Sequence, residues 1–230
     1  MKGCVLVLRP EPGATATAAR ARALGLAAVT APLFTVRPVG WDAPDPATFD
    51  AVLLTSANAP RHAGPQLSAF LHLPCRAVGE ATAAAACEAG FTDVTTGEGD
   101  GAAALAALAG RIFHPCGRDR VPLSHPRGTI ERRVVYAADA VERLPIPARK
   151  ALAAGAVVLL HSPRAAATFA SLADAAGLAR HGVIAAAISD AAAAAFGGGW
   201  GRVAVAARPR DEALLELAAQ LCQNMSPRRE

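Results

Sequence analysis

The sequence has few aromatic residues and lacks the long apolar runs that a membrane helix needs. Phe, Trp and Tyr make up only 4% of the 230 residues, whereas 53% of the residues are hydrophobic. The core must therefore consist mainly of Ala, Leu and Val, and the apolar content excludes a disordered chain. No stretch reaches about 18 uninterrupted apolar residues, so we expect no membrane span. The apolar run in residues 1–8 is too short for a signal peptide, which predicts a cytoplasmic protein.

The sequence also lacks the residue patterns of several common functional sites. Its 5 cysteines are odd in number and form no CxxC pair, which argues against a disulfide framework and against a zinc site. Its 6 histidines show no metal-ligand spacing, so we expect no metal. The glycine-rich stretch at 97–101 lacks the lysine of a phosphate-binding loop, and no G-x-S-x-G elbow is present. These absences exclude the common nucleotide-binding and serine-hydrolase sites.

The charge balance is weakly basic and favours an anionic partner. The formal net charge is +4 and the pI is about 9.1. A nucleic-acid binder would show clustered basic residues with interleaved aromatics. Here the arginines are scattered, and the densest group, Arg228 and Arg229, is a terminal tail. We therefore predict a small anionic ligand and no nucleic acid.

Short apolar runs alternate with alanine-rich stretches along most of the chain. The predicted strands lie at residues 4–8, 27–31, 51–54, 75–78, 93–95, 111–114, 134–136, 156–160, 183–188 and 202–206. Helices are expected between most of them, the first capped by Thr15 or Thr17. Such alternation predicts an α/β fold with parallel sheets covered on both faces. A further helix is due within residues 115–133, but Pro122 and Pro126 interrupt it.

Two stretches of the chain are repeated, which predicts two similar α/β units. Residues 53–59 (LLTSANA) are echoed at 159–165 (LLHSPRA), and residues 77–83 are echoed at 187–193. Each copy is a buried strand that runs into a turn of small residues before a helix. A chain of this length can hold two domains. The proline-rich segments at 32–49 and 137–147 are the candidate crossings between them.

Polar residues follow several of the predicted strands, where ligands bind in open α/β sheets. A serine, threonine, asparagine or aspartate at such a place can simply cap a helix. Free N–H groups at helix starts also bind anions, so several starts around one cleft would hold a polycarboxylate. His161 lies at one strand end, although an ordinary loop histidine is the simpler interpretation. The remaining candidates are Arg9, 55–58, 79–82, 116–118, 162–164 and 189–190.

Tyr136 is the only tyrosine, and it lies at the end of a predicted strand. A phenol carries its proton at neutral pH and can donate it. An aromatic ring packed at a domain edge explains the position equally well.

Taken in order, these motifs resemble the uroporphyrinogen-III synthase family. The resemblance covers nearly the full length and rests on the motif order. The motifs that match the family are RPEPG (9–13), LTSANA (54–59), AVGEATA (77–83), CGR (116–118), VVY (134–136), LHSPRA (160–165) and the closing A-x-P-x-x-x-x-L (207–214).

The resemblance implies two flavodoxin-like parallel-sheet domains that are joined by two extended linker strands, with the ligand cleft between them. Residues 1–35 and 146–230 would form one discontinuous α/β domain. Residues 36–145, including the linker strands, would form the inserted second domain. Because the sequence offers no exposed apolar stripe, a monomer is expected.

The resemblance also implies an activity. The family closes hydroxymethylbilane, a linear tetrapyrrole with eight carboxylates, into uroporphyrinogen III with inversion of ring D and loss of water, in haem biosynthesis. It uses no metal and no organic cofactor. Tyr136 matches the tyrosine that the family offers as a proton donor. The substrate-binding residues that match are Arg9, Thr55, Ser56, Asn58, Gly79, Glu80, Thr82, Gly117, Arg118, Ser162, Arg164 and Ser189.

The sequence departs from the family pattern in two places, which leaves other functions open. The family's Ile-Gly-Pro-Thr-Thr-Ala turn is ISDAAA at 188–193, where Asp190 is unfavourable beside carboxylates. The segment after Arg118 lacks the usual full helix. One alternative is an inactive family member. Another is a non-catalytic two-domain protein that binds a small polyanionic ligand.

Overall fold

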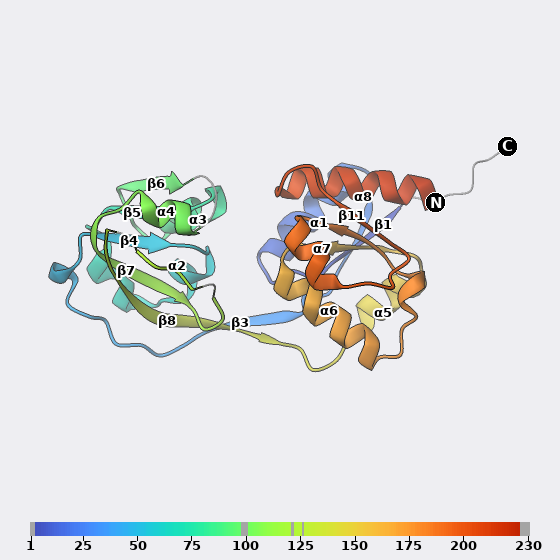
Figure 1. Cartoon of the computed structure of the whole chain (residues 1–230), viewed down its shortest axis with the longest axis horizontal. Coiled ribbons are helices and arrows are strands. Elements are labelled where there is room, and N and C mark those ends of the chain that lie inside the picture. The colour runs from blue at the N-terminus through green and yellow to red at the C-terminus, as the bar shows by residue number, and fades with distance from the viewer. Residues whose placement is uncertain (1–2, 98–100, 121, 126, 226–230) are drawn as a thin grey trace. The chain divides into compact units, whose positions relative to one another are not determined.

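The computed structural model describes residues 3–97, 101–120, 122–125 and 127–225. It divides into two compact units, each with a parallel-dominated sheet between helices (Figure 1). Unit 1 comprises residues 1–35 and 140–230, and unit 2 comprises residues 36–139. The predicted α/β class is therefore confirmed. No helix within the described ranges combines the length and the apolar character needed to span a bilayer.

Unit 1 is a five-stranded sheet in the order β2-β1-β9-β10-β11, and all four strand pairs are parallel. This is the 2-1-3-4-5 order of flavodoxin-like folds. Helices α1 and α8 cover one face, and α5, α6 and α7 cover the other. The elements are β1 (Cys4–Val7), α1 (Gly13–Ala23), β2 (Ala27–Thr30), α5 (Ile146–Ala153), β9 (Val157–Leu160), α6 (Pro163–Ala175), β10 (Ile184–Ala187), α7 (Asp190–Phe196), β11 (Arg202–Val205) and α8 (Asp211–Met225).

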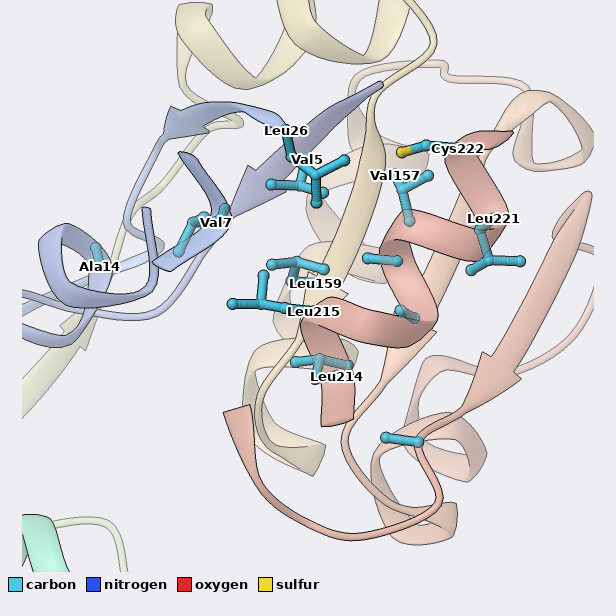
Figure 2. Packing of buried hydrophobic residues seen from close by; sticks show 14 residues of the cluster. Val5, Val7, Ala14, Leu26, Val157, Leu159, Leu214, Leu215, Leu221 and Cys222 are labelled. Carbon is cyan, nitrogen blue, oxygen red and sulfur yellow. The ribbon is translucent and has the colours of Figure 1, made fainter. Parts of the chain in front are cut away.

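Small aliphatic side chains fill the core of unit 1, as the scarcity of aromatic residues requires. Leu214 and Leu215 of α8 are fully buried against Val157 and Leu159 of β9 (Figure 2). Burying a leucine side chain contributes about 1.5–3 kcal/mol. Val5 of β1 belongs to the same cluster, so the two ends of the chain share one core.

Unit 2 has the same strand order when its strands are counted from β7. Its sheet runs β3-β8-β7-β4-β5-β6, so β4, β5 and β6 correspond to β9, β10 and β11 of unit 1. The repeated sequences therefore lie on corresponding strands. The elements are β3 (Phe34–Pro38), β4 (Ala51–Leu54), α2 (Asn58–His62), β5 (Cys75–Val78), α3 (Glu80–Glu88), β6 (Val94–Gly97), α4 (Gly101–Ala106), β7 (Gly110–Gly117) and β8 (Gly128–Ala140), with short 3-10 turns at Pro46–Thr48 and Pro65–Phe70.

Three local predictions are corrected. Helix α1 begins at Gly13 without a side-chain cap, and Thr17 is buried instead of capping it. The helix expected between the strands at 51–54 and 75–78 stops at His62, because Gly64 has a φ of 75° and Pro65 follows it. Strand β8 extends to Ala140, so Tyr136 lies inside this strand and not at its end.

The interrupted helix after β7 is a confirmed prediction. Strands β7 and β8 are parallel neighbours, and such pairs usually need a helical crossover. The described residues between Arg118 and Arg127 contain no helix. A short, proline-containing crossover thus runs past the carboxyl end of β7.

Candidate functional site

A pocket of about 490 Å³ lies at the carboxyl edge of the sheet in unit 2. This is the edge at which open α/β sheets bind ligands, and the volume is typical of small-molecule sites. The ends of β4, β5 and β7 and the start of α4 contribute its walls. The lining residues are Thr55, Ser56, Val78, Gly101, Ala102, His114, Gly117, Asp119, Arg120, Pro122, Leu123 and Tyr136.

The turn after β4 places the hydroxyl groups of Thr55 and Ser56 at the pocket, at the point where the buried strand ends. All four residues of β4 are buried, and the chain reaches the sheet edge at Thr55. The Ser56 Oγ accepts a hydrogen bond from the Asn58 N–H at 3.2 Å, which holds the turn into α2. Helix α4 begins close by, since a Cβ on Gly101 would lie 3.1 Å from the Thr55 Cγ2.

A β-bulge aims Tyr136 into this pocket. Cys116 pairs with Val134 and Gly117 pairs with Tyr136, so Val135 is an extra residue on β8. The Arg118 N–H donates to the Tyr136 carbonyl at 2.9 Å, and this bond closes the irregular pair. Bulges next to active sites commonly redirect a side chain in this way.

The phenol of Tyr136 lies directly over Gly117. A Cβ added at Gly117 would lie 2.7 Å from the Tyr136 Cζ and 2.8 Å from its Oη. Only glycine therefore permits this placement of the ring. The His62 ring of α2 lies at a tilt to the Tyr136 ring, with 6.3 Å between the two ring centroids. Burial and the neighbouring Arg61 lower the pKa of His62, which favours its neutral form.

His114 is a pocket residue that the sequence reasoning missed. Its side chain is 1% exposed, and its Nδ1 lies 2.9 Å from the Leu53 carbonyl oxygen. Burial lowers the pKa of His114 to about 4, and the charges of Arg132 and Arg120 oppose protonation as well. Because a carbonyl only accepts, the hydrogen-bond geometry assigns the proton to Nδ1 and leaves Nε2 as an acceptor. The sequence signal that could have identified His114 is a histidine directly after the apolar pair Ile112 and Phe113 in a predicted strand.

A second cavity, of about 410 Å³, adjoins the first and shares Arg120, Pro122 and Leu123 with it. Arg118 and Arg132 complete its lining. Arg118 is ion-paired with Asp139 and lies 3.8 Å from Asp119. The hydrogen bond to Asp139 raises the pKa of the Arg118 guanidinium.

The corresponding edge of unit 1 is occupied by an ion cluster around Asp211. The Asp211 carboxylate accepts from the Thr17 hydroxyl at 3.0 Å, from the Arg20 Nε at 2.8 Å and from the His161 Nε2 at 2.7 Å. Burial alone would raise the pKa of Asp211, but these hydrogen bonds hold it well below its usual range. Burial lowers the pKa of His161 despite this partner. Arg9 completes the cluster, with its Nη1 3.7 Å from Asp211 and 3.3 Å from the Thr17 Oγ1.

Two predicted serines of unit 1 cap helices. The Ser162 Oγ accepts from the Ala165 N–H at 3.1 Å at the start of α6, and the Ser189 Oγ accepts from the Ala192 N–H at 3.3 Å at the start of α7. These bonds satisfy N–H groups that a helix start leaves without partners. The Arg164 guanidinium lies over the Phe34 ring, 4.5 Å from its centroid.

The structure brings only some of the predicted site residues together. In unit 2, Thr55, Ser56, Gly117 and Tyr136 line one pocket, and Arg118 lines its neighbour. Asn58, Gly79, Glu80 and Thr82 line neither cavity, and Thr82 is buried inside α3. Arg9, Ser162, Arg164 and Ser189 belong to unit 1. Within the described ranges, no three His, Cys, Asp or Glu side chains gather closely enough to hold a metal ion.

Comparison with known proteins gives matches to one family. The sequence profile of uroporphyrinogen-III synthase HemD matches residues 15–216. The structure of uroporphyrinogen-III synthetase from Helicobacter pylori is similar, with a TM-score of 0.62 and 18% identity over 96% of this chain and 100% of that chain. A mutant uroporphyrinogen III synthase from Thermus thermophilus gives a TM-score of 0.54 and 18% identity over 95% of this chain and 99% of that one. Because the sequence identity is only 18%, these structural similarities show a shared fold and nothing more. No curated protein matches the sequence.

Proposed function

The chain belongs to the uroporphyrinogen-III synthase family, whose members are cyclising lyases of haem biosynthesis, and we propose that the pocket of unit 2 carries its chemistry. The reaction converts hydroxymethylbilane to uroporphyrinogen III with inversion of ring D and loss of water. The observation that carries the proposal is the Tyr136 phenol, which the bulge in β8 places in a pocket at the carboxyl edge of the sheet.

Tyr136 serves as the proton donor in the first step. The C–O bond of the hydroxymethyl group on ring A breaks, and the phenol proton passes to the departing oxygen, which leaves as water. The electron pair of the ring A nitrogen forms a C=N bond as the exocyclic C=C forms, and the N–H proton passes to the tyrosinate, which gives a neutral azafulvene and restores the phenol. A positioned acid of this kind contributes about 10²–10⁴-fold in rate. Gly117 supports the step because its missing side chain lets the phenol lie at this position.

The later steps depend on how the substrate is held. Ring D attacks the azafulvene through its substituted carbon and forms a spiro intermediate, which fragments and closes again with ring D inverted. Spontaneous closure gives the uninverted isomer, so the protein must fix the folded geometry of the chain. The His114 Nε2 is an acceptor suited to a pyrrole N–H, and it requires no change of protonation at neutral pH.

Each unit carries candidate donors for carboxylates of the substrate. In unit 2, Thr55, Ser56, Gly117 and Arg118 line the cavities and offer hydroxyl groups, a backbone N–H group and a guanidinium. Asn58, Gly79, Glu80 and Thr82 lie outside the cavities, at the starts of α2 and α3, and are proposed only through their backbone N–H groups. In unit 1, Ser162, Arg164 and Ser189 stand at the starts of α6 and α7, where backbone N–H groups attract anions. Arg9 is a weaker candidate, because Asp211 already offsets its charge.

The test is the isomer formed from hydroxymethylbilane that a deaminase generates in the same vessel. The porphyrins are oxidised and separated by chromatography. Predominantly isomer III supports the proposal. Isomer I alone, from protein with a native circular-dichroism spectrum, rejects it and favours a non-catalytic protein that binds a polyanion.

We further propose a cytoplasmic monomer that binds no nucleic acid. All five cysteines are unpaired, which suits a reducing compartment. The large exposed apolar side chains of the described residues, Leu24, Ile146 and Val205, lie on separate elements, and scattered apolar residues need no partner subunit. Light scattering at two protein concentrations tests the monomer directly.

A further inference from the structure

Four arginine side chains of unit 2 are ion-paired with a carboxylate. Arg37 and Arg118 pair with Asp139, and Arg111 and Arg133 pair with Glu131. In each case the carboxylate offsets part of the positive charge, and its oxygens repel the carboxylates of a ligand.

Arg120 and Arg132 differ from these arginines. The Arg120 Nη1 donates to the carbonyls of Gly117 and Arg118, and the Arg132 Nη2 donates to the Leu123 carbonyl. Among the described residues, neither guanidinium has a carboxylate within ion-pair distance. A carbonyl orients a guanidinium without cancelling its charge, and five N–H donors per guanidinium leave several unused.

Both guanidinium groups face the space beside Tyr136. They line the cavity of about 410 Å³ that adjoins the Tyr136 pocket, and Arg120 lines both cavities. Arg132 and Tyr136 lie on the same strand, β8. Arg120 lies in the crossover between β7 and β8, at a position without helix or strand structure.

We infer that Arg120 and Arg132 form a subsite for a carboxylate of the tetrapyrrole. Two uncompensated guanidinium groups at one cavity match a carboxylate, which accepts two parallel N–H bonds from an arginine fork. The apolar walls supplied by Pro122 and Leu123 suit the carbon chain that joins such a carboxylate to its pyrrole. The inference rests on the proposed function for the identity of the ligand.

The kinetic test compares three single variants in the isomer III assay. Arg120→Gln and Arg132→Gln should each raise KM about tenfold, the low end for a hydrogen bond to a charged group, and should leave kcat within about twofold of the wild type. Arg127→Gln is the matched control, because Arg127 is exposed and also donates to backbone carbonyls, those of Ala106 and Leu108, but lines neither cavity. Its KM should equal that of the wild type. An unchanged KM in both site variants, or an equal rise in the control, would overturn the subsite.

A binding measurement separates this inference from the proposed function. Fluorescence titration with uroporphyrin, a cyclic octacarboxylate, should show weaker binding by the Arg120→Gln and Arg132→Gln variants and no change in Arg127→Gln. If the wild type forms no isomer III but this difference persists, the proposed function fails and the subsite stands. If isomer III forms but both site variants bind uroporphyrin as the wild type does, the subsite fails alone. Arg120→Lys, which keeps the charge and the fold, should recover part of the affinity.

Discussion

The two units share one strand order but differ at the edge where their ligands would bind. In unit 1 the first crossover is helix α1, which supplies Thr17 and Arg20 to the buried carboxylate of Asp211. In unit 2 the corresponding crossover, from β7 to β8, has no helix among its described residues, and the edge holds a pocket. The comparison teaches that one topology can hold an ion cluster or a pocket at the carboxyl edge of its sheet.

The two edges also differ in how far their arginine charges are offset by carboxylates. Asp211 offsets the cations around it, whereas Arg120 and Arg132 keep their charge. A buried charge that loses its partners is costly, so the cluster of unit 1 stabilises the fold as a set. Substitution of Asp211 should therefore act on stability, and substitutions of Tyr136, Arg120 and Arg132 should act on turnover or substrate affinity.

The largest expected effect is the loss of the ion cluster. Asp211→Ala should lower the free energy of unfolding by about 3 kcal/mol, since it leaves the buried Thr17 hydroxyl and His161 ring without their acceptor. Urea denaturation followed by circular dichroism measures the change. Glu212→Ala is the control and should have almost no effect, because the Glu212 carboxylate is exposed and lies 4.0 Å from Arg20. A loss below about 1 kcal/mol for Asp211→Ala would contradict the structural role.

The same carboxylate predicts acid sensitivity. The pKa of Asp211 is held below its value in the unfolded chain, so the unfolded state binds the proton first as the pH falls. The stabilisation by Asp211 is therefore present above about pH 4 and is lost as the pH falls further. The Asp211→Ala variant should lack this part of the pH dependence.

His114 should give a second, higher window of pH dependence. Its pKa of about 4 in the folded state lies below the ordinary histidine value, so the unfolded state takes up the proton first. Stability should therefore fall by about 2–3 kcal/mol as the pH drops from about 6.5 to about 4. His114→Asn retains a donor for the Leu53 carbonyl and should remove this slope. The test measures the urea unfolding midpoint of both proteins across that pH range. If the midpoint of the variant still falls with pH as in the wild type, other groups cause the pH dependence.

A methyl group at Gly117 should lower the turnover of the protein more than its stability. Gly117→Ala would push the Tyr136 ring from its place, costing about 1–3 kcal/mol of stability and lowering kcat of the folded protein. Gly40→Ala is the control, because no atom lies within 4 Å of a Cβ at that position. Thermal unfolding and isomer III turnover should separate the two variants, and wild-type turnover in Gly117→Ala would argue against the position assigned to the phenol.

The smallest effects should come from the serines of the two repeated turns. Ser162→Ala removes the cap of α6, a helix of 13 residues, and should cost about 1 kcal/mol of stability. Ser56→Ala affects α2, which has 5 residues, so we expect a smaller loss of stability together with a higher KM. Equal stability losses and equal KM values would show that the two turns do not differ in role.

Local patterns in the sequence were sufficient to predict the alternation of elements, the caps at Ser162 and Ser189, and the missing helix after Arg118. Each of these features depends on residues that are close together in the chain, such as a serine before an apolar run or a proline within it. Position in the sequence also singled out Tyr136 and residues 116–118, and the resemblance added their expected roles; the structure places Tyr136 and Gly117 in contact.

Other features depend on long-range pairing that local patterns do not contain. The bulge that places Tyr136 inside β8 follows from its register with β7. The Thr17–Asp211 bond joins residues that are 194 positions apart. The acceptor role of His114 requires the Leu53 carbonyl of a neighbouring strand. The pairing of Arg118 with Asp139, and the lack of such a partner for Arg120 among the described residues, likewise emerge only from the folded sheet.

The most direct test of the difference between the units compares Tyr136→Phe with Asp211→Asn in one experiment. For each variant, isomer III turnover is measured on folded protein and the unfolding midpoint is measured in urea. Tyr136→Phe should keep the wild-type midpoint and a similar KM while kcat falls about 100-fold, as expected for the loss of a general acid. Asp211→Asn should lower the midpoint and keep kcat. A wild-type kcat in Tyr136→Phe, or a loss of kcat without a loss of stability in Asp211→Asn, would contradict the assignment of chemistry to unit 2 and of stabilisation to the Asp211 cluster.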